Sequence, residues 1–164
     1  MEKKDLDWGN IGFSYMPTDK RYVANYKDGA WDEGGMTSDP NVVINECAGI
    51  LQYCQEIFEG LKAYTTEDGS IVTFRPDLNA ERMMDSARRL EMPPFPKERF
   101  LEAVDKVVKA NAAWVPPFGS GATLYLRPYM FATGPVIGVK PSQEYQFRLF
   151  GTPVCPYFKG GAKP

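Results

Sequence analysis

Two Asp-Gly pairs, each set between short runs of β-forming residues, constrain the fold of this chain more than any other feature of its sequence. Asp28-Gly29 lies inside the segment Arg21–Glu33, and Asp68-Gly69 separates Phe58–Thr65 from Ile71–Arg75. Asp-Gly favours the positive backbone φ angles of tight hairpin turns, and the flanking Val, Ile, Thr, Tyr and Phe residues favour strands. Because a short turn joins antiparallel neighbours, the pattern predicts two hairpins in a mainly antiparallel sheet.

Two helices are predicted after these hairpins. The first begins at Pro76 and ends before Met92, and its apolar residues approximate one helical stripe. The members of this stripe are Leu78, Met83, Ala87 and Leu90, with Met84 beside them. The second helix runs from about Lys97 to Trp114, where apolar residues recur every three or four positions opposite a face of lysines and glutamates.

Further strands are predicted after the helices. Ala122–Ala132 and Glu144–Val154 are rich in Tyr, Phe and Leu, whereas Asn41–Leu51 has no clean period and is expected to be a loop with a possible short strand. The order predicts an α+β fold: a two-layer sandwich of a mainly antiparallel sheet with both helices on one face. We expect this domain to span residues 1–154, and a Gly/Pro-rich interdomain linker to begin at residues 155–164.

Composition excludes several classes of function. Among the 164 residues there is no histidine, which excludes histidine-based catalysis and histidine zinc sites, and the net charge of −2 includes no basic run for nucleic acid. No apolar stretch approaches the ~20 residues that cross a bilayer, and the first residues lack a signal peptide, so we expect a cytoplasmic protein without membrane contact. Cys47, Cys54 and Cys155 lack metal-ligand spacing and are expected to be buried thiols.

A tyrosine and an arginine two residues apart are the first candidate for binding chemistry. On a strand, Tyr125 and Arg127 point to the same face, about 7 Å apart. A phenol and a guanidinium at that separation can hold one carboxylate between them. By spacing alone, however, a cross-strand surface pair is the more frequent explanation.

Three further features admit both a functional and a structural interpretation. Arg82 on the first helix has the chemistry to hold a phosphate, although by itself it fits an exposed helix surface better. Gly60 either admits a ligand or another backbone, or marks a β-bulge. Nothing directs Glu56 and Glu59 toward a common point, so neither is expected to be catalytic. Four aromatic residues either line an apolar pocket or pack in the core: Phe13, Tyr53, Phe58 and Tyr157.

Four stretches of the sequence keep an order and spacing that together are specific. They are Tyr53–Tyr64 (YCQEIFEGLKAY), Phe74–Met83 (FRPDLNAERM), Tyr125–Pro128 (YLRP) and the closing Val154–Gly161 (VCPYFKGG). The set resembles branched-chain amino acid aminotransferases from about Phe13 to Gly161. This resemblance implies the small N-terminal domain of a fold-type IV enzyme that binds pyridoxal phosphate between two domains. It also implies a homodimer or larger assembly that moves an amino group between Leu, Ile or Val and 2-oxoglutarate.

The resemblance also implies roles for individual residues. Arg82 matches the arginine that binds the cofactor phosphate, Tyr125 matches a residue that helps hold the substrate α-carboxylate, and Arg127 matches one that meets the distal carboxylate of glutamate. Ile137 and Val139 match the apolar tips of a loop that reaches the active site of the other subunit. The residues implied to line the side-chain pocket are Phe13, Tyr53, Phe58 and Tyr157.

Other parts of the active site are implied to lie outside this sequence. In the family, the Schiff-base lysine, the acidic partner of the pyridine nitrogen and most of the phosphate site belong to a C-terminal domain, and no lysine here lies in that motif. We therefore expect the chain alone to be inactive, to bind no cofactor by itself and to need the C-terminal domain as its partner. The alternatives are a D-amino acid aminotransferase, an aminodeoxychorismate lyase, or a non-catalytic module that binds a carboxylate.

Overall fold

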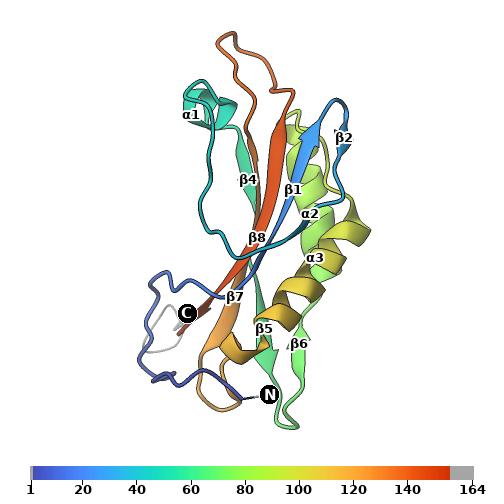
Figure 1. Ribbon diagram of the computed structural model, residues 1–164. Coiled ribbons are helices and arrows are strands. Elements are labelled where there is room, and N and C mark those ends of the chain that lie inside the picture. Colours follow the sequence, from blue (N-terminus) through green and yellow to red (C-terminus); the bar gives the residue numbers. More distant parts are fainter. Residues whose placement is uncertain (1, 156–164) are drawn as a thin grey trace, which may run out of the picture.

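The computed structural model describes residues 2–155, which form a twisted sheet covered on one face by two helices (Figure 1). The strands are β1 (Arg21–Lys27), β2 (Ala30–Trp31), β3 (Gly35–Thr37), β4 (Glu56–Phe58), β5 (Leu61–Thr65), β6 (Ile71–Thr73), β7 (Thr123–Ala132) and β8 (Tyr145–Val154). The helices are α1 (Gly49–Tyr53), α2 (Pro76–Arg89) and α3 (Lys97–Ala110), followed by the 3-10 turn η1 (Ala112–Trp114). The sheet order is β2-β1-β8-β7-β5-β6, with β3 beside β1 and β4 beside β7.

Both hairpins are found where the Asp-Gly pairs predicted them. Asp28 and Gly29 have φ angles of 52° and 82°, and they join β1 to β2, which pair antiparallel. Gly69 also has a φ of 82°, in the turn that joins β5 to β6. Every strand pair in the described residues is antiparallel, so the predicted sheet is confirmed.

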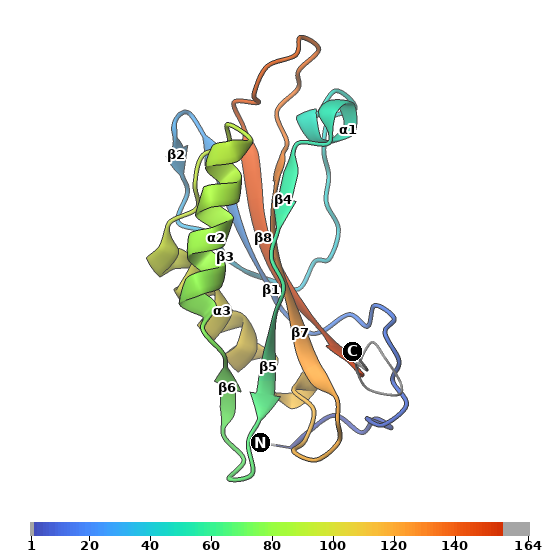
Figure 2. The ribbon, with the colours of Figure 1, turned by 180° about the vertical axis from the view of Figure 1, so that it is seen from behind.

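The core lies between the sheet and the helices α2 and α3, which cover the same face (Figure 2). On β7, the side chains of Leu124, Leu126 and Met130 are fully buried toward the helices. Each such side chain contributes about 2 kcal/mol by leaving water. Because side chains alternate along a strand, Tyr125 and Arg127 must then point to the opposite side, which we call the outer face.

The register of β4 and β5 excludes a bulge at Glu59-Gly60. Ile57 pairs with Met130 on β7 and Leu61 pairs with Leu126, so both chains advance by four residues between these pairs. A bulge would add a residue to one side only. The two short strands therefore follow one continuous path along β7, and Glu59 donates its backbone N–H to the carbonyl of Pro128 at 2.8 Å.

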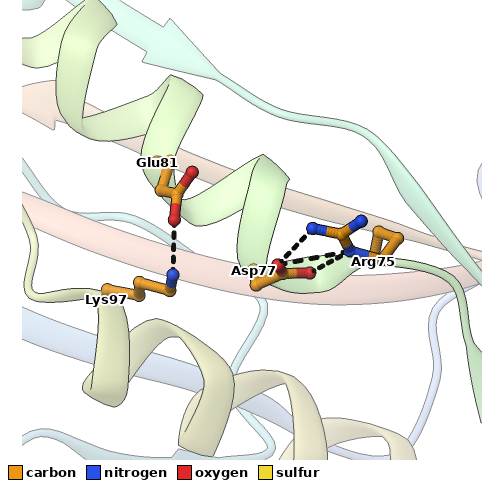
Figure 3. Close-up of polar contacts among 4 residues, drawn as sticks. All are labelled: Arg75, Asp77, Glu81 and Lys97. Carbon is orange, nitrogen blue, oxygen red and sulfur yellow. Dashed lines mark hydrogen bonds and ion pairs between the residues drawn. The ribbon is translucent and has the colours of Figure 1, made fainter.

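The start of α2 is fixed by an ion pair between Arg75, just before the helix, and Asp77 in its first turn (Figure 3). Arg75 has a φ of 46°, and its Nε and Nη2 contact the Asp77 carboxylate at 2.9 and 2.8 Å. This contact lowers the pKa of Asp77 to about 2. One turn later, Glu81 accepts a hydrogen bond from Lys97 at the start of α3. The contacts fix α2 at both of these points, and Arg82 follows Glu81 directly.

The structure corrects several details of the sequence prediction. Asn41–Leu51 contains the first turn of α1 rather than a strand. Leu78 and Leu90 are nearly half exposed, and the buried stripe of α2 is Ala80, Met83 and Ala87 instead. The second helix was expected to reach Trp114, but α3 ends at Ala110. The reason is that the buried side chain of Asn111 bonds the backbone of Lys20 at 2.8 and 2.9 Å, which turns the chain into η1.

The cysteines were also expected to be buried, and this is wrong for all three. Cys54 is exposed, and Cys47 and Cys155 are partly exposed. Cys54 follows α1 with a φ of 52°, a left-handed cap position at the surface. A helix of only five residues buries little of its surface, so a cysteine at its end stays in contact with solvent.

Candidate functional site

Three of the predicted site residues meet on the outer face. Arg127 donates a hydrogen bond from Nε to the hydroxyl of Tyr125 at 2.8 Å. The guanidinium carbon lies 4.3 Å from the ring centroid of Phe58, on the neighbouring strand β4. Within residues 2–155, Arg127 makes no ion pair, and Phe58 is largely exposed. The result is a cationic group against an aromatic wall, open to a ligand.

Gly60 leaves the space that the tyrosine of this cluster occupies. A Cβ atom at Gly60 would lie 2.9 Å from Oη of Tyr125 and 3.1 Å from a ring carbon. Contacts this short require the ring to move. The sequence offered a ligand, another backbone or a bulge as the reason for Gly60, whereas the group that approaches it in the structure is the side chain of Tyr125.

A buried glutamate orients the second predicted arginine. Arg82 binds the carboxylate of Glu59 through Nε at 2.7 Å and Nη2 at 2.6 Å, and Asn79 donates to the same carboxylate at 2.8 Å. The side chain of Glu59 is 4% exposed and that of Arg82 is 68% exposed. The hydrogen bonds and charge of Glu59 raise the pKa of Arg82. The remaining N–H groups of Arg82 face solvent in a fixed direction.

Sequence reasoning gave Glu59 no role, although the sequence held a signal for one. Ile57, Glu59 and Leu61 alternate along one path, and the two apolar members are buried. The period-2 rule places the middle residue on the same buried side. A buried carboxylate requires a positive partner, and Arg82 on the covering helix provides it.

The loop between β7 and β8 and the helix α1 form a separate group. Tyr53 on α1 donates a hydrogen bond to the carbonyl of Ile137, and Gly49 donates its N–H to the carbonyl of Gly134 at 3.1 Å. Ile137 and Val139 are 72% and 90% exposed at the tip of the loop. No hydrogen bond or ring contact in the described residues joins Tyr53 to the Tyr125–Arg127 pair.

The N-terminal segment that carries Phe13 runs beside the end of β8. Cys155 donates its N–H to the carbonyl of Gly12 at 2.8 Å, and Met16 donates its N–H to Oγ1 of Thr152 at 2.9 Å. Thr152 is the register partner of Tyr125, so Phe13 lies on a segment at the same end of the sheet. The fourth predicted aromatic residue, Tyr157, lies outside the described residues.

Two negative findings apply to residues 2–155. No helix there is long and apolar enough to cross a membrane. No group of three or more His, Cys, Asp or Glu side chains is placed to hold a metal ion in that range.

Comparison with characterised proteins identifies relatives along nearly the whole chain. The branched-chain-amino-acid aminotransferase of Haemophilus influenzae is 55% identical over 161 residues, which is 98% of this chain and 47% of the relative. The Helicobacter pylori protein of the same name is 48% identical over 158 residues, 96% of this chain and 46% of the relative. No family model matches the chain. The chain thus spans about half the length of the curated relatives it matches.

Solved structures show the same fold. A branched-chain aminotransferase from Thermoproteus uzoniensis, crystallised with norvaline, aligns with a TM-score of 0.68 at 22% identity, over 87% of this chain and 43% of that one. The Escherichia coli enzyme aligns with a TM-score of 0.62 at 21% identity, over 82% and 39% of the two chains. Over nearly its whole length, this chain is thus similar in sequence to branched-chain-amino-acid aminotransferases, and it has the fold of the matching part of those enzymes.

Proposed function

We propose that this chain is the N-terminal half of a branched-chain amino acid transaminase, which moves an amino group between Leu, Ile or Val and 2-oxoglutarate. The position of Arg127 carries this proposal. Its guanidinium lies between the hydroxyl of Tyr125 and the ring of Phe58 on the outer face of the sheet. The names of the sequence relatives support the reaction.

Tyr125 and Arg127 together suit the two carboxylates of glutamate. Because Arg127 Nε donates to Oη of Tyr125, the phenol keeps its own proton for donation to a substrate α-carboxylate. The terminal nitrogens of Arg127 are outside that hydrogen bond and offer a planar pair of donors to a distal carboxylate. The pair therefore binds and orients a dicarboxylate substrate through two different groups.

The same residues also accommodate an apolar substrate side chain. When leucine is bound, no carboxylate neutralises Arg127, and a buried unpaired charge is costly. The guanidinium instead rests 4.3 Å from the ring centroid of Phe58 and 5.3 Å from that of Tyr125. Contacts of this kind are worth about 0.5–2 kcal/mol. The two rings thus give the charge a position beside the leucine side chain.

Arg82 fits the phosphate group of pyridoxal phosphate. Glu59 engages Nε and Nη2, so Nη1 and the second proton of Nη2 are free to bond phosphate oxygens at the exposed end of the side chain. The buried carboxylate fixes the guanidinium before any ligand arrives. When bound, pyridoxal phosphate supplies the electron sink of transamination, and Arg82 binds and orients it through its phosphate.

In this proposal the remaining half of the protein and a second copy complete the active site. Residues 1–154 form the small domain, and residues 155–164 begin the linker. The other half of the protein supplies the Schiff-base lysine. Ile137 and Val139 extend an exposed apolar loop toward the neighbouring subunit of a cytoplasmic homodimer. The aromatic residues assigned to the side-chain pocket are Phe13, Tyr53, Phe58 and Tyr157.

Steady-state kinetics of the full-length protein test this proposal. Arg127→Ala is expected to raise the KM for glutamate and 2-oxoglutarate by roughly tenfold or more, since a charged hydrogen bond is lost. The KM for leucine should change by less than about twofold, because leucine makes no ion pair with Arg127. Arg127→Lys keeps the charge without the planar donors and should restore only part of the glutamate binding. Equal losses for both substrates, or activity with D-alanine and none with L-leucine, rule the proposal out.

A further inference from the structure

Two other arginines, Arg21 on β1 and Arg148 on β8, are almost completely buried on the outer face of the sheet. They are 3% and 6% exposed. Arg148 is the register partner of Val23, and Arg21 lies two residues before Val23. The two are therefore diagonal neighbours on one face, and such neighbours lie roughly 7–8 Å apart. Two positive charges stand close together in a region from which water is mostly excluded.

Both guanidinium groups are bonded to uncharged partners. Arg21 donates to the carbonyls of Ser38 at 2.7 Å and Thr18 at 2.8 Å, and its buried Nε has no partner. Arg148 donates to the carbonyls of Asp39 and Asn41, each at 3.2 Å, and to Oε1 of Gln146 at 3.0 Å. Neither arginine is in an ion pair within residues 2–155. These bonds hold the chain after β3 against the sheet but leave both charges uncompensated.

The acidic side chain on this same loop does not neutralise them. The carboxylate of Asp39 is exposed and accepts hydrogen bonds from the backbone and side-chain amides of Asn41, at 2.9 and 2.8 Å. Arg148 and Arg21 contribute to lowering the pKa of Asp39, but the bonds from Asn41 are the larger cause. The carboxylate thus stays on the solvent side of the loop.

Arg21 and Arg148 line a pocket of about 390 Å³, within the usual range for small-molecule sites. Its walls are aromatic: Phe150 meets Tyr129 edge to face at 5.9 Å between ring centroids, and Tyr15 meets Phe150 in the same way at 5.8 Å. Apolar rings beside two uncompensated guanidinium groups match a small carboxylate with a short apolar body.

We infer that this Arg21–Arg148 pocket binds small carboxylates and is distinct from the cluster of Phe58, Tyr125 and Arg127. One carboxylate compensates the paired charges and can accept the hydrogen bonds that Arg21 and Arg148 have left to donate. Phe150 is the register partner of Arg127, so its ring stands between the two sites. The inference does not depend on the proposed transaminase activity, because the residues that line this pocket are different from those assigned to the transaminase site.

Calorimetric titration of the full-length protein with isovalerate tests the inference. This carboxylate has no amino or oxo group, and 3-methylbutanamide has a closely similar shape without the charge. We expect Arg148→Met to weaken isovalerate binding at one site by about tenfold or more, and Arg127→Ala to leave that site unchanged. The amide should bind there at least about tenfold more weakly than isovalerate. If replacing Arg127 removes all isovalerate binding, or Arg148→Met changes none of it, the inference is wrong.

A second variant covers the risk that Arg148→Met loosens the loop it holds. Tyr15→Glu places a carboxylate at the wall of the pocket from an exposed position. It should abolish isovalerate binding at this site and leave the melting temperature unchanged or raised, because the new carboxylate replaces the ligand. Undiminished binding in this variant overturns the inference.

Discussion

Arg82 and Arg127 belong to the same proposed site but are held in opposite ways. Arg82 forms two hydrogen bonds to the buried carboxylate of Glu59, at 2.6 and 2.7 Å. Arg127 instead contacts the hydroxyl of Tyr125 and the ring of Phe58. The first arginine is fixed by a charge partner of its own. The second keeps its charge uncompensated within the described residues, and it is held only by weaker contacts.

The difference matches what each arginine is proposed to bind. A cofactor phosphate is the same group in every reaction cycle, so a donor with one fixed direction loses little entropy on binding it. The substrate position must accept both a carboxylate and an aliphatic side chain, so its arginine needs two resting positions. An arginine locked by a glutamate would serve the first task and fail the second.

Arg82→Ala is expected to give the largest loss of stability among the variants that test this contrast. It leaves the buried Glu59 carboxylate with Asn79 as its one remaining side-chain partner in the described residues. We expect a loss of about 2 kcal/mol in urea unfolding, a value reduced because Arg82 is mostly exposed. Arg127→Ala, the matched control, should cost about 1 kcal/mol or less, because it removes ring contacts and one hydrogen bond but unpairs no charge. Similar losses for the two variants would remove the contrast.

Gly60→Ala should have the next largest effect. The added methyl group would meet Tyr125 at 2.9 Å, and because that ring is only partly buried we expect a cost of about 1 kcal/mol, the low end for overpacking. The displaced phenol would also leave Arg127, so glutamate binding should weaken together with stability in thermal unfolding and titration. Gly35→Ala is the control, because nothing lies within 4 Å of its Cβ position and it lies on β3, outside the proposed site. Normal glutamate affinity in Gly60→Ala would show that Tyr125 does not position Arg127.

The smallest effect is expected at the exposed pair of Arg75 and Asp77. The folded-state pKa of Asp77, about 2, lies below its unfolded value near 3.8, so the ionised carboxylate stabilises the fold fully above about pH 4. That contribution disappears as the pH falls through 2. Melting temperatures of the wild type and Asp77→Asn should therefore differ at pH 6 and converge near pH 2. A difference independent of pH would contradict the ion pair.

Local patterns were sufficient to predict most of the fold and part of the site. Asp-Gly pairs gave both hairpins, and the two-residue period gave the shared face of Tyr125 and Arg127. The boundary at Asn111 was missed because the side chain that ends α3 bonds Lys20, far away in the sequence. Exposed Leu78 and Leu90 fit a helical stripe equally well, since periodicity alone cannot tell which turns of a helix the sheet covers.

The sequence by itself determined the alternation of side chains along β7 and the presence of two arginines suited to anions. Only the tertiary structure decided how each arginine is held. Glu59 is 20 or more residues from its partners Asn79 and Arg82, and Phe58 meets Arg127 from another strand. Hydrogen bonds and charge pairs act over a few ångströms in space, so the Glu59 contacts exist only after α2 packs against the sheet, and the Phe58–Arg127 contact only after β4 pairs with β7.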